Sequence, residues 1–293
     1  MGASPSKRGD YSTQVIYRRW QTPDPDSETS PELVGPQQFY WMDLNERVEH
    51  ALPYGILAPS QPPQFAYQRG GEENPMCDLI FTMKDESGLD QIVRYDTSPG
   101  VKDEERTHFL TTPTEGRRWN HWDPSCFKAP EYAGRVVYAV NVLEEDEEYP
   151  NKMAIYTESA GGEFEMLEYQ GILQIPQAVR DHGFIQISSV EQIVTEKATF
   201  FSVLLVKPGE GNPLYDNSTV WIWSLDGNLQ RRVSGNNPGE GNFLGKDPEI
   251  MRSTDELFVY YNVYALVRTK EKLVDLHRCH TGVSKDGSYT LSS

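Results

Sequence analysis

The stretch that decides the fold runs from Thr219 to Tyr261 and begins Thr219-Val-Trp-Ile-Trp-Ser-Leu-Asp-Gly-Asn-Leu-Gln-Arg-Arg-Val-Ser234. Large apolar residues alternate on both sides of Asp226-Gly227, which predicts a β-hairpin with a tight turn. After a loop rich in Gly, Asn and Pro, Lys246-Asp-Pro-Glu-Ile-Met251 and Leu257-Phe-Val-Tyr-Tyr261 predict a second pair of strands. Weaker copies of this unit follow one another along the chain, so their repetition predicts the fold.

The composition indicates an all-β protein. The 293 residues include 16 tyrosines, 23 glycines and 20 prolines, and aromatic strands with frequent turns are typical of that class. The formal net charge of -17 argues against nucleic acid and against anionic membranes as partners, because both require clustered Lys and Arg. We therefore expect neither partner.

The sequence also bears on the compartment and on cofactors. It contains no apolar run of transmembrane length and no apolar N-terminal stretch of the signal-peptide type. The protein is expected to be soluble, either cytoplasmic or secreted after removal of a signal peptide. Three widely spaced cysteines, Cys77, Cys126 and Cys279, indicate neither a disulfide framework nor a metal site. We predict no metal and no other cofactor, and the oligomeric state stays open.

One aromatic or histidine position recurs in the third strand of successive four-stranded units. It is occupied by Trp41, Tyr95, Tyr156, Trp223 and His277, which are 54, 61, 67 and 54 residues apart. Two Asp-Pro pairs, at 123–124 and 247–248, each lie at the start of a predicted first strand and are 124 residues apart. A four-stranded unit repeated about every sixty residues is typical of β-propeller blades.

We therefore predict an all-β fold with a disordered N-terminus at 1–12 and a single β-propeller over 13–293. It has five blades of four antiparallel strands around a central channel, since sheets packed around an axis cover faces that one sheet cannot bury alone. The last unit shows all four strands and the first only three, unless residues 1–12 hold an inner strand. A β-sandwich, or two smaller β domains, is the alternative.

Two pieces of the sequence resemble known propellers. Val220–Val233 is similar to the outer hairpin of TolB-type repeats, in which an apolar strand ends in Asp-Gly. Lys246–Tyr261 and, more loosely, His121-Trp-Asp-Pro-Ser125 resemble the strand openings of five-bladed glycoside hydrolases of the arabinanase and fructosidase type. The resemblance implies the blade architecture. Those glycosidases also need a third carboxylate on another inner strand, which the sequence does not identify, so no catalytic role carries over.

Candidate site residues are sought where a propeller forms its channel mouth, at the starts of the first strands and in the loops leading into them. The segment 117–123 offers cations, a histidine, two aromatic rings and a carboxylate, which suit a sugar or a planar organic ligand. Asp247 and Glu249 lie two residues apart on a predicted strand and so share a face, as paired acid/base carboxylates would. His182, in the loop before the fourth unit, could act as a general base oriented by a carboxylate.

Each of these residues also has a plain structural interpretation. Trp119 and Trp122 could pack between blades, Asp123 and Asp247 could form turns before proline, and 180–182 could be an exposed polar loop. His277 and His280 flank Cys279, but an outer strand is far from the channel, so we expect no metal site there.

We predict an enzyme with one asymmetric active site in the channel, acting as hydrolase or lyase on a carbohydrate or similar small organic molecule. The catalytic assignments are His121, Asp123, Asp247 and Glu249, and the substrate-binding assignments are Arg118, Trp119, Trp122, His182 and Gln64. One alternative is a biosynthetic cyclase that shapes an apolar substrate, since some fungal cyclisation enzymes are thought to use propeller scaffolds. The other is a non-catalytic lectin or protein-interaction scaffold. A lectin would repeat one site in every blade, whereas these first strands diverge, which favours an enzyme.

Overall fold

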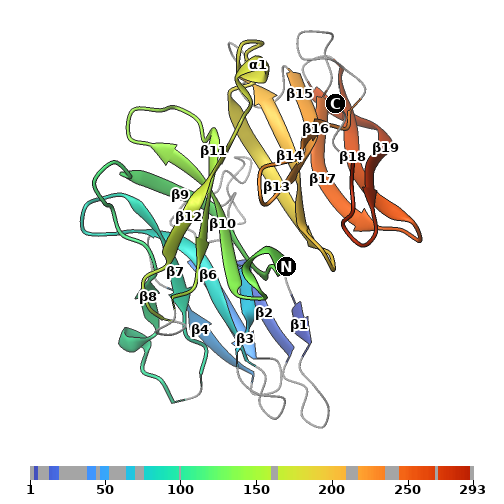
Figure 1. The fold of residues 1–293 in the computed structure, drawn as a ribbon. Helices are drawn as coiled ribbons and strands as arrows, with labels where there is room; N and C mark the ends of the chain where they lie inside the picture. Colours follow the sequence, from blue (N-terminus) through green and yellow to red (C-terminus); the bar gives the residue numbers. More distant parts are fainter. Residues whose placement is uncertain are drawn as a thin grey trace, which may run out of the picture. The chain divides into compact units, whose positions relative to one another are not determined.

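The computed structural model describes residues 3–5, 13–19, 38–43, 47–52, 64–69, 76–98, 100–159, 164–208, 217–234, 244–267 and 270–290. Nearly all regular structure in these ranges is β-strand, as Figure 1 shows. The helical pieces there are the α-helix α1 (Gln177–Arg180) and the 3-10 turns η1 (Asp103–Glu105) and η2 (Pro130–Tyr132). The predicted all-β class is confirmed.

The strands form five sheets that contain antiparallel pairs, and each sheet is built from consecutive strands of the chain. Sheet one holds β1 (Ala3–Pro5), β2 (Thr13–Arg19), β3 (Gln38–Asp43) and β4 (Val48–Ala51). Sheet two holds β5 (Gln64–Arg69), β6 (Met76–Lys84), β7 (Asp90–Tyr95) and β8 (Thr107–Phe109). Sheet three holds β9 (Trp119–Lys128), β10 (Val136–Glu144), β11 (Lys152–Thr157) and β12 (Glu168–Gln174). Sheet four holds β13 (Gln186–Val194), β14 (Thr199–Lys207), β15 (Asn217–Ser224) and β16 (Gln230–Arg232), and sheet five holds β17 (Leu244–Arg252), β18 (Glu256–Val267) and β19 (Lys270–Ser284).

The hairpin that opened the sequence argument forms as predicted. β15 pairs with β16 across a turn at Asp226-Gly227, where Gly227 has a φ of 74°. Oδ1 of Asp226 accepts hydrogen bonds from the hydroxyl of Ser224 at 2.5 Å and from the backbone N–H of Asn228 at 3.0 Å. A glycine tolerates this left-handed backbone, and the aspartate side chain satisfies the donors of the turn.

The third-strand position also forms as predicted in every sheet. Register pairs place its residue opposite the second strand, as Ile16↔Trp41, Leu79↔Tyr95, Tyr138↔Tyr156, Phe201↔Trp223 and Tyr261↔His277. The four aromatic residues are at most 6% exposed, whereas His277 is exposed. The repeat therefore marks a structurally equivalent strand, with burial in four sheets and exposure in the fifth.

The ends of the chain differ from the prediction. β1 supplies a fourth strand to sheet one, within the segment 1–12 that was expected to be disordered. Sheet five has three strands among the described residues, and the predicted last strand is reduced there to one bridge, Val283↔Tyr289. β1 is thus the inner strand within 1–12 that the sequence left open, and the predicted last strand, 288–291, extends beyond the described residues. Short pieces such as β1 carry too few residues to show an alternating pattern.

The chain divides into two compact units, Met1–Cys126 with Glu158–Glu168, and Phe127–Thr157 with Tyr169–Ser293. In the first unit, sheets one and two share a buried cluster that contains Phe39, Trp41, Leu79, Phe81 and Tyr95. In the second unit, one cluster joins sheets three and four and another joins sheets four and five. Consecutive sheets within each unit therefore pack against one another.

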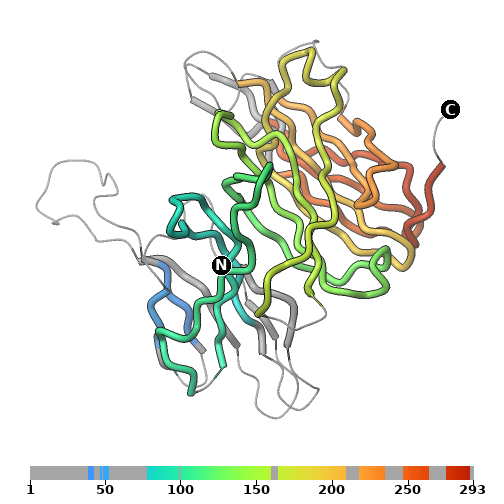
Figure 2. The backbone as a smooth tube through the Cα atoms, turned by 60° about the vertical axis from the view of Figure 1, so that its left-hand side comes forward, coloured from blue at the N-terminus to red at the C-terminus, as the bar shows by residue number. Residues whose placement is uncertain are grey.

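Sheet four is buried on both faces, and its sequence explains why. In β14, Phe201, Val203 and Leu205 belong to the cluster shared with sheet three. Alternate residues of the same strand, including Phe200 and Leu204, belong to the cluster shared with sheet five. A strand with two covered faces is a continuous apolar run, as Phe-Phe-Ser-Val-Leu-Leu-Val is here. Figure 2 shows the strands of sheets four and five, from yellow to red, lying beside each other in the second unit.

Within the described ranges, no helix has both the length and the apolar character that a membrane crossing requires.

Candidate functional site

Two aspartates with unusual backbone conformations mark the candidate site. Asp123 has a φ of 55° and Asp247 a φ of 50°, and each is followed by proline. A left-handed backbone costs most residues with a Cβ about 1–2 kcal/mol, because the Cβ approaches the following carbonyl oxygen, and aspartate and asparagine are among the few that adopt it more readily. The proline disfavours helical backbone at the residue before it still further. Such conformations persist only where the surrounding structure enforces them, and they are frequent at active sites.

The register of sheet five shows what the Asp-Pro pair does there. Lys246 pairs with Asn262 and Glu249 with Tyr260, so Asp247 and Pro248 together lie opposite Tyr261. Two residues opposite one is a β-bulge, and bulges are frequent beside active sites because they re-aim a side chain. The carbonyl of Pro248 accepts a hydrogen bond from the hydroxyl of Ser202 at 2.6 Å, which holds the bulge against sheet four.

Both Asp-Pro pairs lie inside their strands. Asp123 is the fifth residue of β9, and Asp247 is the fourth residue of β17. The left-handed backbone of both aspartates therefore lies within a strand. Proline has no N–H for the ladder, and a strand accommodates it at an edge or a bulge, which is what sheet five shows.

Asp247 and Glu249 share the exposed side of β17. Asp247 and Glu249 are exposed, while Pro248 and Ile250 are buried, so the strand alternates across the bulge. The side-chain amide of Asn262 lies 3.4 Å from Oδ2 of Asp247. Two carboxylates therefore reach solvent from neighbouring positions on one strand, as their spacing predicts.

His121 is buried within the first unit, with 3% of its surface exposed. Its Nδ1 lies 3.0 Å from the backbone carbonyl of Asp90, on β7. Burial lowers the pKa of His121 to about 4, and the contact with the Asp90 carbonyl opposes this only in part. The imidazole is therefore neutral at pH 7, with Nδ1 placed to donate a hydrogen bond to that carbonyl.

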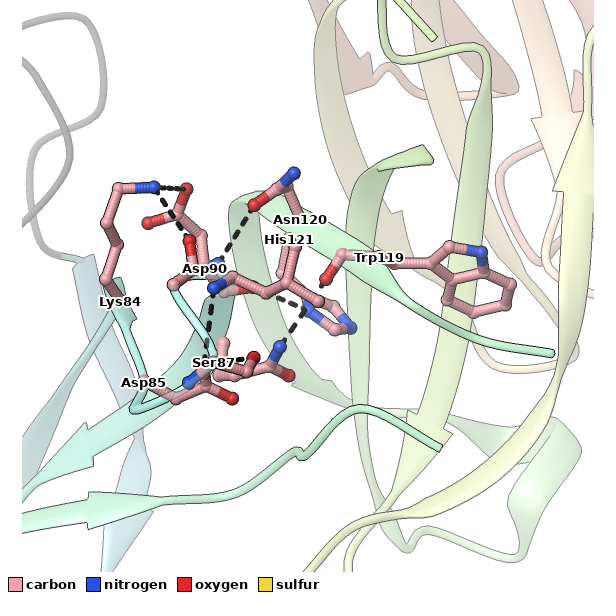
Figure 3. A network of polar contacts seen from close by, with 10 residues as sticks. Lys84, Asp85, Ser87, Asp90, Trp119, Asn120 and His121 are labelled. Carbon is pink, nitrogen blue, oxygen red and sulfur yellow. Dashed lines mark hydrogen bonds and ion pairs between the residues drawn. The ribbon is translucent and has the colours of Figure 1, made fainter. Parts of the chain in front are cut away.

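A polar network joins β9 to the hairpin before β7, as Figure 3 shows. The backbone N–H of Asp90 donates to the side chain of Asn120 at 3.0 Å, and the Gln91 amide approaches the carbonyl of Trp119 at 3.5 Å. Lys84 forms an ion pair with Oδ2 of Asp90 at 3.3 Å. Burial nevertheless raises the pKa of Asp90 above its usual value, and Lys84 opposes that shift. The network fixes the first three residues of β9, two residues before Asp123.

The predicted substrate-binding residues lie in different surroundings. Arg118 is exposed, Trp119 is buried and Trp122 is half-buried along β9 and the residue before it. His182 is exposed just after α1, and its backbone N–H donates to the carbonyl of Val179 at 3.1 Å. Gln64 begins β5 opposite Ile80, and its side chain lies outside the described part.

The candidate residues fall into two groups. Arg118, Trp119, His121, Trp122 and Asp123 lie together on one segment of the first unit, while Asp247, Glu249 and His182 belong to the second unit. The prediction that Asp123 and Asp247 meet across a channel stays a prediction.

Sequence reasoning missed a buried ion pair in sheet two. Arg94 on β7 donates from Nε to Oδ2 of Asp78 on β6 at 2.8 Å, and from a terminal nitrogen to Glu158 at 2.8 Å. The Asp78 side chain is fully buried and that of Arg94 is 3% exposed, with the guanidinium 5.3 Å from the centre of the Phe164 ring. A charge within the apolar run of β6, and an opposite charge on the next strand, were the available sequence evidence.

The chain matches no model of a known protein family, and no curated protein matches it.

Proposed function

We propose that the five sheets are the blades of one five-bladed β-propeller, and that Asp123 and Asp247 act there on a carbohydrate or a similar small polar molecule. The enzyme is a hydrolase or a lyase, with one asymmetric site in the central channel. Glu249 assists from the strand of Asp247, and Arg118 and Trp122 bind the substrate.

The repeated construction of the sheets supports the propeller. Each sheet comes from a consecutive part of the chain, its third strand carries the aligned position, and consecutive sheets within each unit share buried clusters. In the first unit, β9 of sheet three also hydrogen-bonds β7 of sheet two. Blades of a propeller have this order, with each sheet packed on the next.

The left-handed Asp-Pro pair carries the functional proposal. It occurs in the first strand of sheet three and again in the first strand of sheet five, where regular strand backbone would have a lower conformational free energy. Asparagine and glycine also suit a left-handed position, so the aspartate supplies a charge that the backbone alone does not require. Two carboxylates on opposed strands are the groups that acid/base chemistry on a glycosidic bond uses.

The surroundings of the aspartates fit a polar substrate. Asp247 and Glu249 are exposed, and the half-buried Asp123 follows the half-buried ring of Trp122. An aromatic face beside carboxylates binds the apolar face of a sugar while the acids reach its hydroxyl groups or its glycosidic oxygen. The neutral imidazole of His121 holds β9 in place beside them.

The test measures turnover of 4-nitrophenyl glycosides, arabinan and fructan by the wild type, Asp123→Asn and Asp247→Asn. Asparagine keeps the shape and tolerates the left-handed backbone, so both variants fold, while turnover falls about 10²–10⁴-fold. Asp255→Asn is the matched control, because Asp255 is exposed in the hairpin that follows β17 and lies outside the proposed site. Full turnover in both asparagine variants would exclude carboxylate chemistry at these positions.

Trp122→Ala separates this proposal from a cyclase. An enzyme that works by shaping an apolar substrate loses its activity with the ring and keeps it in the two asparagine variants. Absence of turnover on every carbohydrate, by wild-type protein with a normal melting transition, counts against the carbohydrate class.

A further inference from the structure

A chain of four polar side chains crosses from β18 to β19 in sheet five. Tyr261 on β18 lies directly opposite His277 on β19, and Val259 lies opposite Cys279. Asp275, His277 and Cys279 alternate along β19, so they share one face of the strand with Tyr261 as neighbour.

The distances connect the four groups in one order. Sγ of Cys279 lies 3.6 Å from the hydroxyl oxygen of Tyr261, and that oxygen lies 3.4 Å from Nδ1 of His277. Nε2 of His277 lies 3.0 Å from a carboxylate oxygen of Asp275. One arrangement of protons satisfies all three contacts: the thiol donates to Tyr261, the Tyr261 hydroxyl donates to Nδ1, and Nε2–H donates to Asp275.

Among these four side chains, Tyr261 is the most buried, and exposure increases from Tyr261 through His277 to Asp275. Tyr261 is 2% exposed, Cys279 is half-buried, and the side chains of His277 and Asp275 are 44% and 64% exposed. Burial, and then the neighbouring Cys279, raise the pKa of the Tyr261 hydroxyl above its usual value, so it keeps its proton near pH 7. It can therefore accept one proton while passing on another, without forming a tyrosinate.

We propose that Cys279 is a nucleophilic thiol whose proton passes through Tyr261 to His277, with Asp275 orienting the imidazole, and that it adds to soft electrophiles such as α,β-unsaturated carbonyl compounds. A nucleophile, a base within reach and a third group that orients the base form the arrangement by which proteins activate weak nucleophiles. The inference does not rest on the proposed carbohydrate chemistry, since it uses neither Asp123, Asp247 nor Glu249.

The addition balances without a further reactant. The thiol proton moves to Tyr261 as the Tyr261 proton moves to Nδ1 of His277, which leaves a thiolate beside a neutral tyrosine. The sulfur attacks the β-carbon, a carbon–sulfur bond forms, and the electron pair of the double bond moves into an enolate. The proton held by His277 then returns to the α-carbon, so one S–H has added across one C=C and no group is oxidised or reduced.

The test uses N-ethylmaleimide, itself an α,β-unsaturated carbonyl compound, on the full chain at pH 7. Timed samples are quenched, digested and analysed by mass spectrometry to give separate rates for Cys279 and Cys126. Cys126 is also partly buried and serves as the internal reference. We expect Cys279 to react at least about 10-fold faster than Cys126, because a positioned base contributes at least that much.

Two variants interrupt the relay, the path of the proton from Cys279 through Tyr261 to His277, at different points. His277→Gln removes the base from an exposed position, and Tyr261→Phe removes the hydroxyl while keeping the ring, so each lowers the Cys279 rate to that of Cys126. His280→Gln is the matched control, because His280 lies on the same strand beside Glu256 and Phe258, outside the relay.

A melting transition like that of the wild type shows that each variant is folded. If Tyr261→Phe disturbs that transition, the exposed His277 variant decides the matter. Equal rates for the two cysteines in the wild type, or an unchanged Cys279 rate in His277→Gln, overturns the proposal.

Discussion

The first strands of sheets two and five each contain one irregularity in register, and each irregularity lies beside a carboxylate. The two carboxylates differ in position and in exposure. In sheet two, the register leaves Ala66 and Tyr67 of β5 opposite Asp78, which is buried and paired with Arg94. In sheet five, Asp247 lies within the bulge itself, left-handed and exposed. A carboxylate opposite the irregularity thus belongs to the core, whereas one inside it is presented to solvent.

This difference separates the carboxylate that stabilises the protein from the one that is available for chemistry. Asp78 accepts the N–H of Thr97 at 3.3 Å as well as the guanidinium of Arg94, so its oxygens are bound inside the sheet. Asp247 has one described contact, the Asn262 amide at 3.4 Å, and its backbone conformation is unfavourable. We expect substitutions to affect folding at the first position and activity at the second.

The largest expected effect is at the buried pair. Asp78→Ala leaves Arg94 buried with Glu158 as its remaining described ion-pair partner, and should lower the free energy of unfolding by about 3 kcal/mol, the lower end of the range for a broken buried pair. The measurement is urea unfolding. Lys102→Ala, which removes the exposed pair with Glu105 at 3.9 Å, is the control and should change stability by about 0.5 kcal/mol or less. A loss below about 1 kcal/mol for Asp78→Ala contradicts the assignment of the pair to the core.

The next effect tests whether His121, like Asp78, is a buried group that contributes to stability. Well above pH 6.5 His121 is neutral in both states, so it adds no pH dependence there. Between pH 6.5 and 4 the unfolded chain binds a proton that the folded protein excludes. The free energy of unfolding therefore decreases as the pH is lowered through this range, by about 3 kcal/mol in all.

His121→Gln should remove this part of the pH dependence, which urea unfolding at a series of pH values measures. His182→Gln, at an exposed histidine, should leave the slope between pH 6.5 and 4 unchanged. If the slopes of wild type and His121→Gln agree, the imidazole is not excluded from protonation in the folded state.

The smallest effect is at the bulge. Asp247→Val should lower the free energy of unfolding by about 1–2 kcal/mol, because a β-branched residue is unfavourable in the left-handed region. Asp247→Gly and Asp247→Asn should stay within about 1 kcal/mol of the wild type, since both residues tolerate that backbone. Thermal or urea unfolding of the three variants gives the order. A valine variant as stable as the wild type shows that the backbone at this position is not strained.

Local patterns predicted what depends on neighbours in the chain. The alternation around Asp226-Gly227 placed a hairpin correctly, and the spacing of aromatic residues found the third strand of each sheet. The Asp-Pro pairs were placed in the correct strands, but the bulge at Asp247-Pro248 was not predicted, because a bulge and a turn use the same residue types.

The buried pair of Asp78 and Arg94 shows why the rest could not be predicted. Their contact depends on the register between β6 and β7, and a slip of one residue would turn each side chain to the other face. The relay from Cys279 to Asp275 depends equally on register, through the pairing of Tyr261 with His277. Whether Asp123 and Asp247 meet depends on how distant sheets are arranged, which no strand pattern contains.

The first unit has a consequence for synthesis of the protein, because it includes Glu158–Glu168 as well as the N-terminal part. Arg94 pairs with Glu158, 64 residues later, and Leu110 accepts a hydrogen bond from the N–H of Leu167 at 2.8 Å. A nascent chain emerges from its N-terminus, so sheet two leaves the ribosome well before this segment does. The unit that begins first is therefore completed only after β10 and β11 have also been made, and a chain that stalls earlier holds Arg94 without Glu158.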